Sequence, residues 1–157
     1  MTAARGAGAS VTRTAMSATP PFAAIKTAPG LARGHVGVVL AEWGLGEYAG
    51  DAQLIASELV ANAVNASAPV QASGRMLVIR VCLVTDGDVL TIECWDQAPG
   101  FPVLREANAL AETGRGLAII DAITDGCWGC QPAIGQDGKC VWGKIALLNP
   151  PFRPLLA

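Results

Sequence analysis

The stretch 54–66, Leu-Ile-Ala-Ser-Glu-Leu-Val-Ala-Asn-Ala-Val-Asn-Ala, constrains the fold more than any other part of the chain. Its composition predicts a helix that is apolar in most directions and therefore mostly buried. Glu58, Asn62 and Asn65 fall at positions i, i+4 and i+7, so they form one polar line along this helix. Residues 34–74 contain no lysine or arginine, so Glu58 has no cation nearby in sequence, and burying an unpaired carboxylate is costly. The polar line is either the solvent-facing edge of a core helix or part of a functional site, and the stretch alone leaves both readings open.

Length and composition predict one well-buried domain. The chain has 157 residues, of which 52% are hydrophobic, enough for one core but short for two. Its formal net charge is -2, and lysine and arginine are scattered singly, so no basic surface for nucleic acid is expected. No apolar run approaches the roughly 20 residues of a membrane-spanning helix, and the N-terminus lacks the apolar core of a signal peptide. We therefore expect a cytoplasmic protein with no direct contact to nucleic acid or membrane.

The two ends of the chain differ in composition from its middle. Residues 1–20 are rich in Ala, Gly, Ser and Thr and have few large apolar side chains, so they cannot offset the entropy of ordering. We expect them to form a disordered tail. Two consecutive prolines open 150–157, which we expect to form a C-terminal tail. The folded domain is therefore expected to span 21–149.

Apolar periodicity predicts the elements of this domain. One helix is expected over 31–43, and a second begins after Asp51 and ends near Pro69, because proline disfavours helix in the residue before it. Runs rich in Val, Ile, Leu and Thr predict strands, and a third helix is expected after the long loop that follows them. These elements are an edge strand at 22–27, a hairpin of 76–84 and 89–95, a helix at 117–123, and strands at 126–131 and 139–148. Their order predicts an α+β fold: a two-layer sandwich with helices on one face of a mixed, mostly antiparallel sheet.

Asp96 stands where the second strand of the hairpin ends and a long loop, 96–113, begins. Loops of this length in compact domains are commonly functional lids, and the Ala/Glu-rich middle of this one allows a short helix. A carboxylate at the end of a buried strand can accept a hydrogen bond from an amino group such as that of adenine. Taken alone, the position favours the simpler reading of an aspartate that only forms a turn.

A Gly-Arg-Gly sequence at 114–116 leads directly into the third expected helix. Glycines permit close approach of the backbone, free amides at a helix start attract phosphate, and Arg115 adds a bidentate phosphate donor. Two better-known phosphate motifs do not fit. The dinucleotide fingerprint fails because Ile119 occupies the third glycine position, and a Walker-type loop fails because 138–139, Gly-Lys, is followed by Cys140 and a strand.

Taken together, these motifs resemble those of a known family. In order along the chain they are Glu-Leu-Val-Ala-Asn-Ala at 58–63, Asp-Gln-Ala-Pro-Gly at 96–100, Gly-Arg-Gly-Leu at 114–117 and Gly-Lys-Cys-Val-Trp at 138–142. Each is weak alone, but in this order and spacing the chain resembles the GHKL (Bergerat-fold) ATP-binding domain from about residue 22 to 148. Within that family it is most similar to the bacterial anti-sigma-factor serine/threonine kinases.

The resemblance implies a site and an activity. It implies that Glu58 is the general base, that Asn62 coordinates Mg²⁺ and that Asp96 reads the adenine amino group. A carboxamide oxygen suits Mg²⁺, which takes few protein ligands beside water and phosphate oxygens. The remaining ATP contacts that it implies are Gly100 and, around the phosphates, Gly114, Arg115, Gly116 and Leu117. The implied reaction is phosphorylation of an anti-sigma-factor antagonist of the STAS type, which regulates a sigma factor, and a homodimer is left open.

Three residues depart from the family pattern and bear on ATP affinity and turnover. Ala66 stands where many relatives have His, Ala98 replaces the middle glycine of Asp-x-Gly-x-Gly, and Cys140 stands where relatives commonly place a Thr near the adenine. Of these, Ala98 and Cys140 favour a second hypothesis, a non-catalytic nucleotide-sensing or partner-binding module of the same fold.

A redox or metal site at Cys127 and Cys130 is a third hypothesis. It has less support, because a thioredoxin-type pair needs a strand before it and a helix after it, the reverse of the order expected here. No second pair with suitable spacing completes a zinc site.

Overall fold

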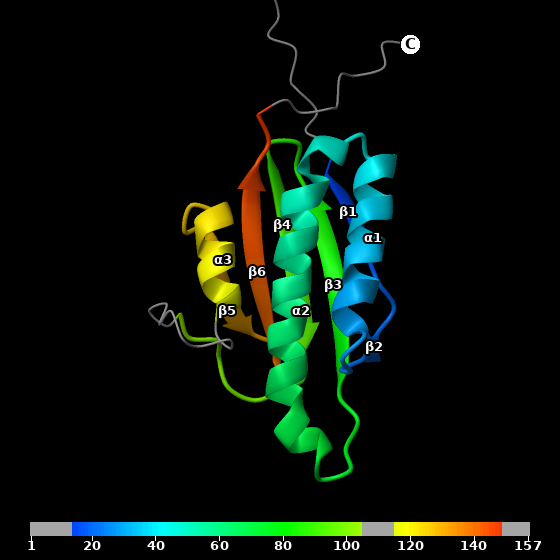
Figure 1. Cartoon of the computed structure of the whole chain (residues 1–157), viewed down its shortest axis with the longest axis vertical. Coiled ribbons are helices and arrows are strands. Elements are labelled where there is room, and N and C mark those ends of the chain that lie inside the picture. The colour runs from blue at the N-terminus through cyan, green and yellow to red at the C-terminus, as the bar shows by residue number, and fades with distance from the viewer. Residues whose placement is uncertain (1–13, 105–114, 149–157) are drawn as a thin grey trace, which may run out of the picture.

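A computed structural model describes residues 14–104 and 115–148 of the chain. Three α-helices cover one face of a six-stranded sheet, and the long helix α2 runs down the middle of that face (Figure 1). This arrangement confirms the expected α+β fold with helices on one face. In chain order the elements are β1 Ala15–Ala18, β2 Phe22–Ala23, α1 Ala28–Glu42, the 3-10 helix η1 Gly46–Tyr48, α2 Ala49–Gln71, β3 Val78–Thr85, β4 Val89–Asp96, α3 Gly116–Ile123, β5 Trp128–Pro132 and β6 Lys139–Ala146.

The sheet has the strand order β1-β3-β4-β6-β5, and β2 also pairs with β3. Every pairing among the described strands is antiparallel. Strands β4 and β6 are neighbours although β5 lies between them in the chain. In their register Asp96 pairs with Lys139, and Ile92 pairs with Gly143. Residues directly opposite each other share a face, so this register decides which side chains meet on the helix side.

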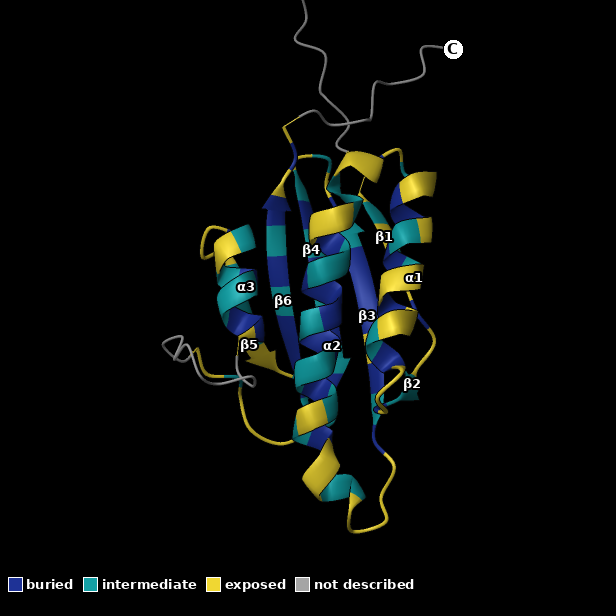
Figure 2. Ribbon diagram, in the orientation of Figure 1, coloured by how far each residue is buried: buried dark blue, intermediate teal, exposed yellow. Residues whose placement is uncertain are grey.

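The core lies between the helices and the sheet. Buried positions alternate along β4, and the side of α2 that faces the sheet is buried over much of its length (Figure 2). Ile55 and Ile120, from α2 and α3, both approach Gly143 closely, so a glycine on β6 lets two helices pack against one strand. Asp96 is the last buried position of β4 and therefore continues the core face of this strand.

Helix α2 continues past the point where the sequence predicts its end. It includes Pro69 and ends at Gln71, so the prediction of an end near Pro69 is wrong. A proline removes the hydrogen bond to the carbonyl four residues earlier, here Asn65, which is exposed and can be hydrated instead. The last turn is also held by tertiary contacts, because Gln71 donates to Ala24 O at 2.9 Å and accepts from Leu77 N at 3.0 Å.

The expected disordered tail is wrong over Ala15–Ala18, which form β1. Three of the four residues are Ala or Ser and carry no local strand signal, but the segment pairs with β3, where Ala18 lies opposite Cys82. Thr19 fixes the end of the strand, since it exchanges two hydrogen bonds with Val81, at 2.9 and 3.0 Å. Residues 1–13 and 149–157 lie outside the described part of the chain.

The other elements match their expected positions to within a few residues. The expected edge strand at 22–27 is shorter, with only Phe22–Ala23 paired. The β3–β4 hairpin is confirmed, and Asp86 closes its turn by accepting hydrogen bonds from the amides of Asp88 and Val89, both at 2.9 Å. No helix in the described residues is long and apolar enough to cross a membrane. The middle of the 96–113 loop, where a short helix is expected, falls mostly outside the described residues.

Candidate functional site

A pocket of about 290 Å³ opens on the helix side of the sheet, where β4 ends and β6 and α3 begin. Its walls come from α2, from the loop after β4 and from the first residues of α3 and β6. The pocket is therefore built from all the segments that carry the motifs of the sequence. Its lining residues are Leu59, Asn62, Ala63, Ala66, Asp96, Pro99, Gly100, Phe101, Pro102, Val103, Leu117, Lys139 and Val141.

Asp96 is the buried acid of this pocket, with a side chain that is 1% exposed. Its Oδ1 accepts hydrogen bonds from Lys139 Nζ at 2.8 Å and from the amide of Ala98 at 2.9 Å. Its Oδ2 is buried as well and has no partner among the described residues. Buried acceptors are normally paired, so an unpaired one beside a pocket is suited to a donor on a ligand.

Lys139 is a pocket residue whose pairing with Asp96 sequence reasoning missed. Its side chain is 5% exposed, and Nζ donates to Asp96 Oδ1 and, at 3.1 Å, to the carbonyl of Ala98. The available signal was a charged residue in an otherwise apolar strand, but pairing it with Asp96 requires the β4–β6 register. Gly138, just before it, has φ +110° and packs so closely on Asp96 that a Cβ would overlap the Asp96 carbonyl oxygen. Only glycine fits there, and this contact fixes the position of Lys139 beside Asp96.

Glu58 and Asn62 meet the start of α3 at Gly116. A Cβ placed on Gly116 would lie 2.6 Å from Glu58 Oε2 and 3.4 Å from Asn62 Oδ1, so both polar groups are in contact with this backbone. The two side chains predicted to act together are thus side by side, against the segment predicted to hold phosphate. Asn65, the third member of the polar line, is exposed and does not line the pocket.

Helix α3 begins at Gly116, with Arg115 as its N-cap residue. Arg115 is exposed, and Leu117 lines the pocket, so the first turn of α3 lies at its border. Amides in the first turn of a helix have no intrahelical partners and can bind phosphate. Gly100 also lines the pocket and has φ +81°, a conformation that favours glycine. Gly114 lies outside the described residues.

The three departures from the family pattern take different places in the structure. Ala66 lines the pocket. The amide of Ala98 donates a hydrogen bond to Asp96 Oδ1. Ala98 does not need the conformational freedom of glycine, because Asp125 is the only non-glycine residue with a positive φ in the described chain. Cys140 does not line the pocket: its neighbours Lys139 and Val141 do, and side chains alternate along a strand. The side chain of Cys140 therefore points away from this pocket.

The cysteines show no sign of a metal or redox site within the described residues. All five are free, and no group of three potential metal ligands occurs there. Cys127 is exposed, whereas Cys130 is partly buried against the core. Burial raises the pKa of Cys140 to about 12 and that of Cys94 well above its ordinary value.

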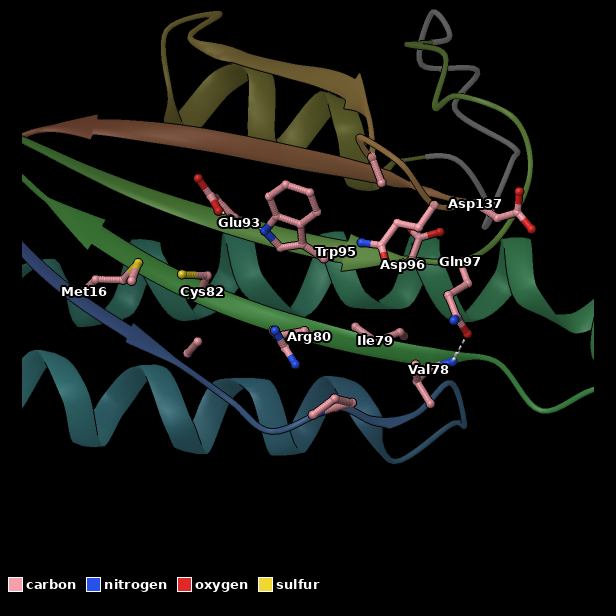
Figure 3. A pocket seen from close by; sticks show the side chains of 14 residues that line it. Met16, Val78, Ile79, Arg80, Cys82, Glu93, Trp95, Asp96, Gln97 and Asp137 are labelled. Carbon is pink, nitrogen blue, oxygen red and sulfur yellow. Dashed lines mark hydrogen bonds between the residues drawn. The ribbon is translucent and has the colours of Figure 1, made fainter.

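A larger hollow, of about 520 Å³, lies on the opposite face of the sheet (Figure 3). Two of the polar side chains that line it already have hydrogen-bond partners. Glu93 accepts a hydrogen bond from the indole of Trp95 at 2.9 Å, and Gln97 accepts one from the amide of Val78 at 3.1 Å, drawn as a dashed line in Figure 3. Asp96 lines both hollows, but of the two only the smaller pocket is also lined by Lys139 and Asn62, with Glu58 beside Asn62 at Gly116. The smaller pocket is therefore the better ligand site.

The fold and the smaller pocket together define a nucleotide-binding α+β domain. A family model for the histidine kinase-like ATPase domain matches residues 22–144. The chain belongs to this family, the GHKL family, and is an ATP-binding domain of the histidine kinase-like type. A comparison with curated proteins found no matching sequence.

The pocket fits the nucleotide that the family implies. The buried Oδ2 of Asp96 matches the amino group of adenine, and apolar residues such as Leu59 and Val141 suit the faces of a purine. For Mg²⁺, the carboxamide oxygen of Asn62 is a suitable ligand beside the first turn of α3.

Proposed function

We propose that this protein is an anti-sigma-factor serine/threonine kinase that transfers the terminal phosphate of ATP to a hydroxyl of a STAS-type antagonist. The observation that carries the proposal is the contact of Glu58 and Asn62 with Gly116. A carboxylate and a carboxamide are thereby held together where α3 begins, beside a pocket with a buried acceptor for adenine.

Each residue in this arrangement has a defined part. Asp96 accepts the adenine amino group, and the first amides of α3 hold the phosphates. Asn62 would hold the metal ion, which when bound would neutralise phosphate charge. Glu58 has no hydrogen bond or ion pair among the described residues, so its carboxylate is free to take the proton of an incoming serine or threonine hydroxyl.

A non-catalytic nucleotide sensor of the same fold is the alternative. Its sequence arguments are Ala98 and Cys140. Both weigh less in the structure, since the amide of Ala98 still bonds Asp96 and Cys140 does not line the pocket. The pairing of a free carboxylate with a metal-type ligand is more than a sensor requires, and this favours the kinase.

Phosphotransfer from labelled ATP to candidate STAS-type antagonists tests the proposal. Glu58→Gln keeps size and hydrogen bonding but loses the base, so ATP binding should persist while transfer falls by about 10²–10⁴. Glu47→Gln, at an exposed glutamate of η1, is the matched control and should transfer phosphate like the native protein. Asn62→Ala should weaken Mg-ATP binding, whereas Asn65→Ala, on the exposed side of the same helix, should not.

The outcome also separates the two candidate functions. If the native protein binds Mg-ATP but phosphorylates no antagonist faster than Glu58→Gln does, the kinase proposal is wrong. The sensor would then stand, with Glu58 as a structural carboxylate only.

A further inference from the structure

We propose that Lys139 reads adenine together with Asp96, by donating a hydrogen bond to the ring nitrogen N1 while Asp96 Oδ2 accepts from the 6-amino group. The inference rests on the ATP binding that the proposed function requires. It concerns the choice of base, and it holds for a kinase and for a sensor alike.

Lys139 has more hydrogen-bond donors than it has acceptors among the described residues. An ammonium group has three hydrogens, and among the described residues Nζ has two acceptors, Asp96 Oδ1 at 2.8 Å and the Ala98 carbonyl at 3.1 Å. Lys139 lines the pocket and its side chain is 5% exposed. A third hydrogen in so buried a place needs an acceptor, and a ligand in the pocket can supply one.

The ion pair of Lys139 and Asp96 also leaves one oxygen of the Asp96 carboxylate without a hydrogen-bond partner among the described residues. Asp96 Oδ1 is occupied by Lys139 and Ala98, while Oδ2 is buried without a partner. The pocket therefore offers one donor and one acceptor side by side. Adenine has the complementary pattern on one edge, since its 6-amino group donates and the adjacent N1 accepts.

The direction of the nucleotide selects N1 over N7, the other ring nitrogen next to the amino group. Asp96 and Lys139 are the most buried charged groups of the site, while Asn62 and Gly116, at the start of α3, are where the phosphates are proposed to lie. The ribose and phosphates leave the purine at N9. N7 lies in the ring that carries N9, and N1 lies at the far end, so the buried pair meets the edge formed by N1 and the amino group.

Guanine reverses both contacts. It presents a carbonyl oxygen where adenine has the amino group and an N–H where adenine has N1. Asp96 Oδ2 would face an acceptor and Lys139 Nζ would face a donor. Two mismatched buried groups reject guanine more strongly than one, because each is left without a partner.

Calorimetric binding of ADP analogues tests this without turnover of the ligand. The native protein should bind 1-deaza-ADP about 10- to 100-fold more weakly than ADP, since a hydrogen bond to a charged group is lost. It should bind 7-deaza-ADP within about threefold of ADP. Equal binding of ADP and 1-deaza-ADP overturns the inference, and so does a loss confined to 7-deaza-ADP.

A substitution of Lys139 then tests whether this residue is the one that contacts N1 of adenine. In Lys139→Met, which removes the donors and keeps most of the chain length, ADP and 1-deaza-ADP should bind equally, because the two changes remove the same contact. Lys144→Met is the matched control. This lysine of the same strand lies over the ring of Trp142, and its variant should keep the full preference for ADP.

The melting temperature of each variant shows whether it is folded. If Lys139→Met does not fold, the analogue series on the native protein still decides. If the native protein binds no adenine nucleotide, the proposed function fails together with the inference. If it binds ADP but ignores N1, only the role of Lys139 fails.

Discussion

Gly116 and Glu58 touch across the interface of α2 and α3. A Cβ on Gly116 would lie 2.6 Å from Glu58 Oε2, closer than real Cβ atoms approach other heavy atoms. The carboxylate of Glu58 can therefore occupy this position beside the start of α3 only because residue 116 has no side chain. The same absence leaves room for the carboxylate of Glu58 and the carboxamide of Asn62 beside the first turn of α3.

Gly116→Ala should consequently damage chemistry more than folding. The contact is with the end of a flexible glutamate side chain, which can move aside at little cost in stability. Moving the base by about 1 Å costs on the order of 10²-fold in rate, so phosphotransfer to an antagonist should fall strongly while the melting temperature changes little. Gly34→Ala is the control, because a Cβ at this helical glycine meets nothing within 4 Å. Unchanged phosphotransfer in Gly116→Ala would contradict the proposed place of Glu58.

Asp96→Asn should lower the affinity for ATP by about 2 kcal/mol or more, which is roughly 30-fold. Oδ1 of the asparagine can still accept from Lys139 and Ala98, but the unpaired Oδ2 becomes an amide that turns a donor toward the adenine amino group. The native protein should bind GTP poorly for the matching reason. Calorimetry with ATP and GTP measures both effects, with Asp125→Asn, an exposed residue, as the control. Equal affinity of the native protein for ATP and GTP would remove the adenine-reading role.

The helices and the hairpin could be predicted because their signals are local. Periodicity placed α1, α3 and the β3–β4 pair to within a few residues, and the spacing of Glu58 and Asn62 placed them on one line of α2. Strand β1 could not be found in this way, since three of its four residues are Ala or Ser and the strand forms by pairing with β3, far along the chain. The predicted end of α2 was wrong because contacts outside the helix stabilise its last turn. Hydrogen bonds of the Gln71 side chain with Ala24 and Leu77 hold the turn beyond Pro69.

The sequence allowed individual residues of the candidate site to be predicted, but not the pairing of Asp96 with Lys139. Asp96, at the end of an apolar strand, could be singled out from the sequence. Lys139 could not be joined to it, because strands distant in the chain must first adopt the register that sets the two residues opposite each other. The same register turns Lys139 and Val141 toward the pocket and Cys140 to the other face, which a count of residues along a motif does not reveal.

The cysteines should react with alkylating reagents in an order set by burial. The thiolate is the reactive form, and burial raises the pKa of Cys94 and Cys140, the latter to about 12, while Cys127 is exposed. At pH 8, iodoacetamide should modify Cys127 first, and Cys94 and Cys140 only after unfolding in denaturant. Peptide mapping by mass spectrometry follows each site. Modification of Cys94 or Cys140 in the native protein as fast as that of Cys127 would contradict the burial described here.

The last prediction concerns the turn of the β3–β4 hairpin and its dependence on pH. Asp86 accepts hydrogen bonds from the amides of Val89 and Asp88, and these bonds hold the pKa of its carboxyl below the ordinary value of 3.8. A carboxyl whose pKa is lowered by folding stabilises the folded state at pH values above its unfolded pKa. This stabilisation is lost as the pH falls through the lower, folded pKa.

Asp86→Asn should therefore lower the melting temperature at pH 7 and have a smaller effect near pH 3, where the native carboxyl begins to take up a proton as well. Asp88→Asn is the control in the same turn, because its side chain accepts no hydrogen bond among the described residues and is exposed. Thermal unfolding of the three proteins at both pH values makes the comparison. A loss of the same size at pH 7 and pH 3 would show that the charge of Asp86 contributes nothing, and that the hydrogen bonds it accepts from the two amides matter only through their geometry.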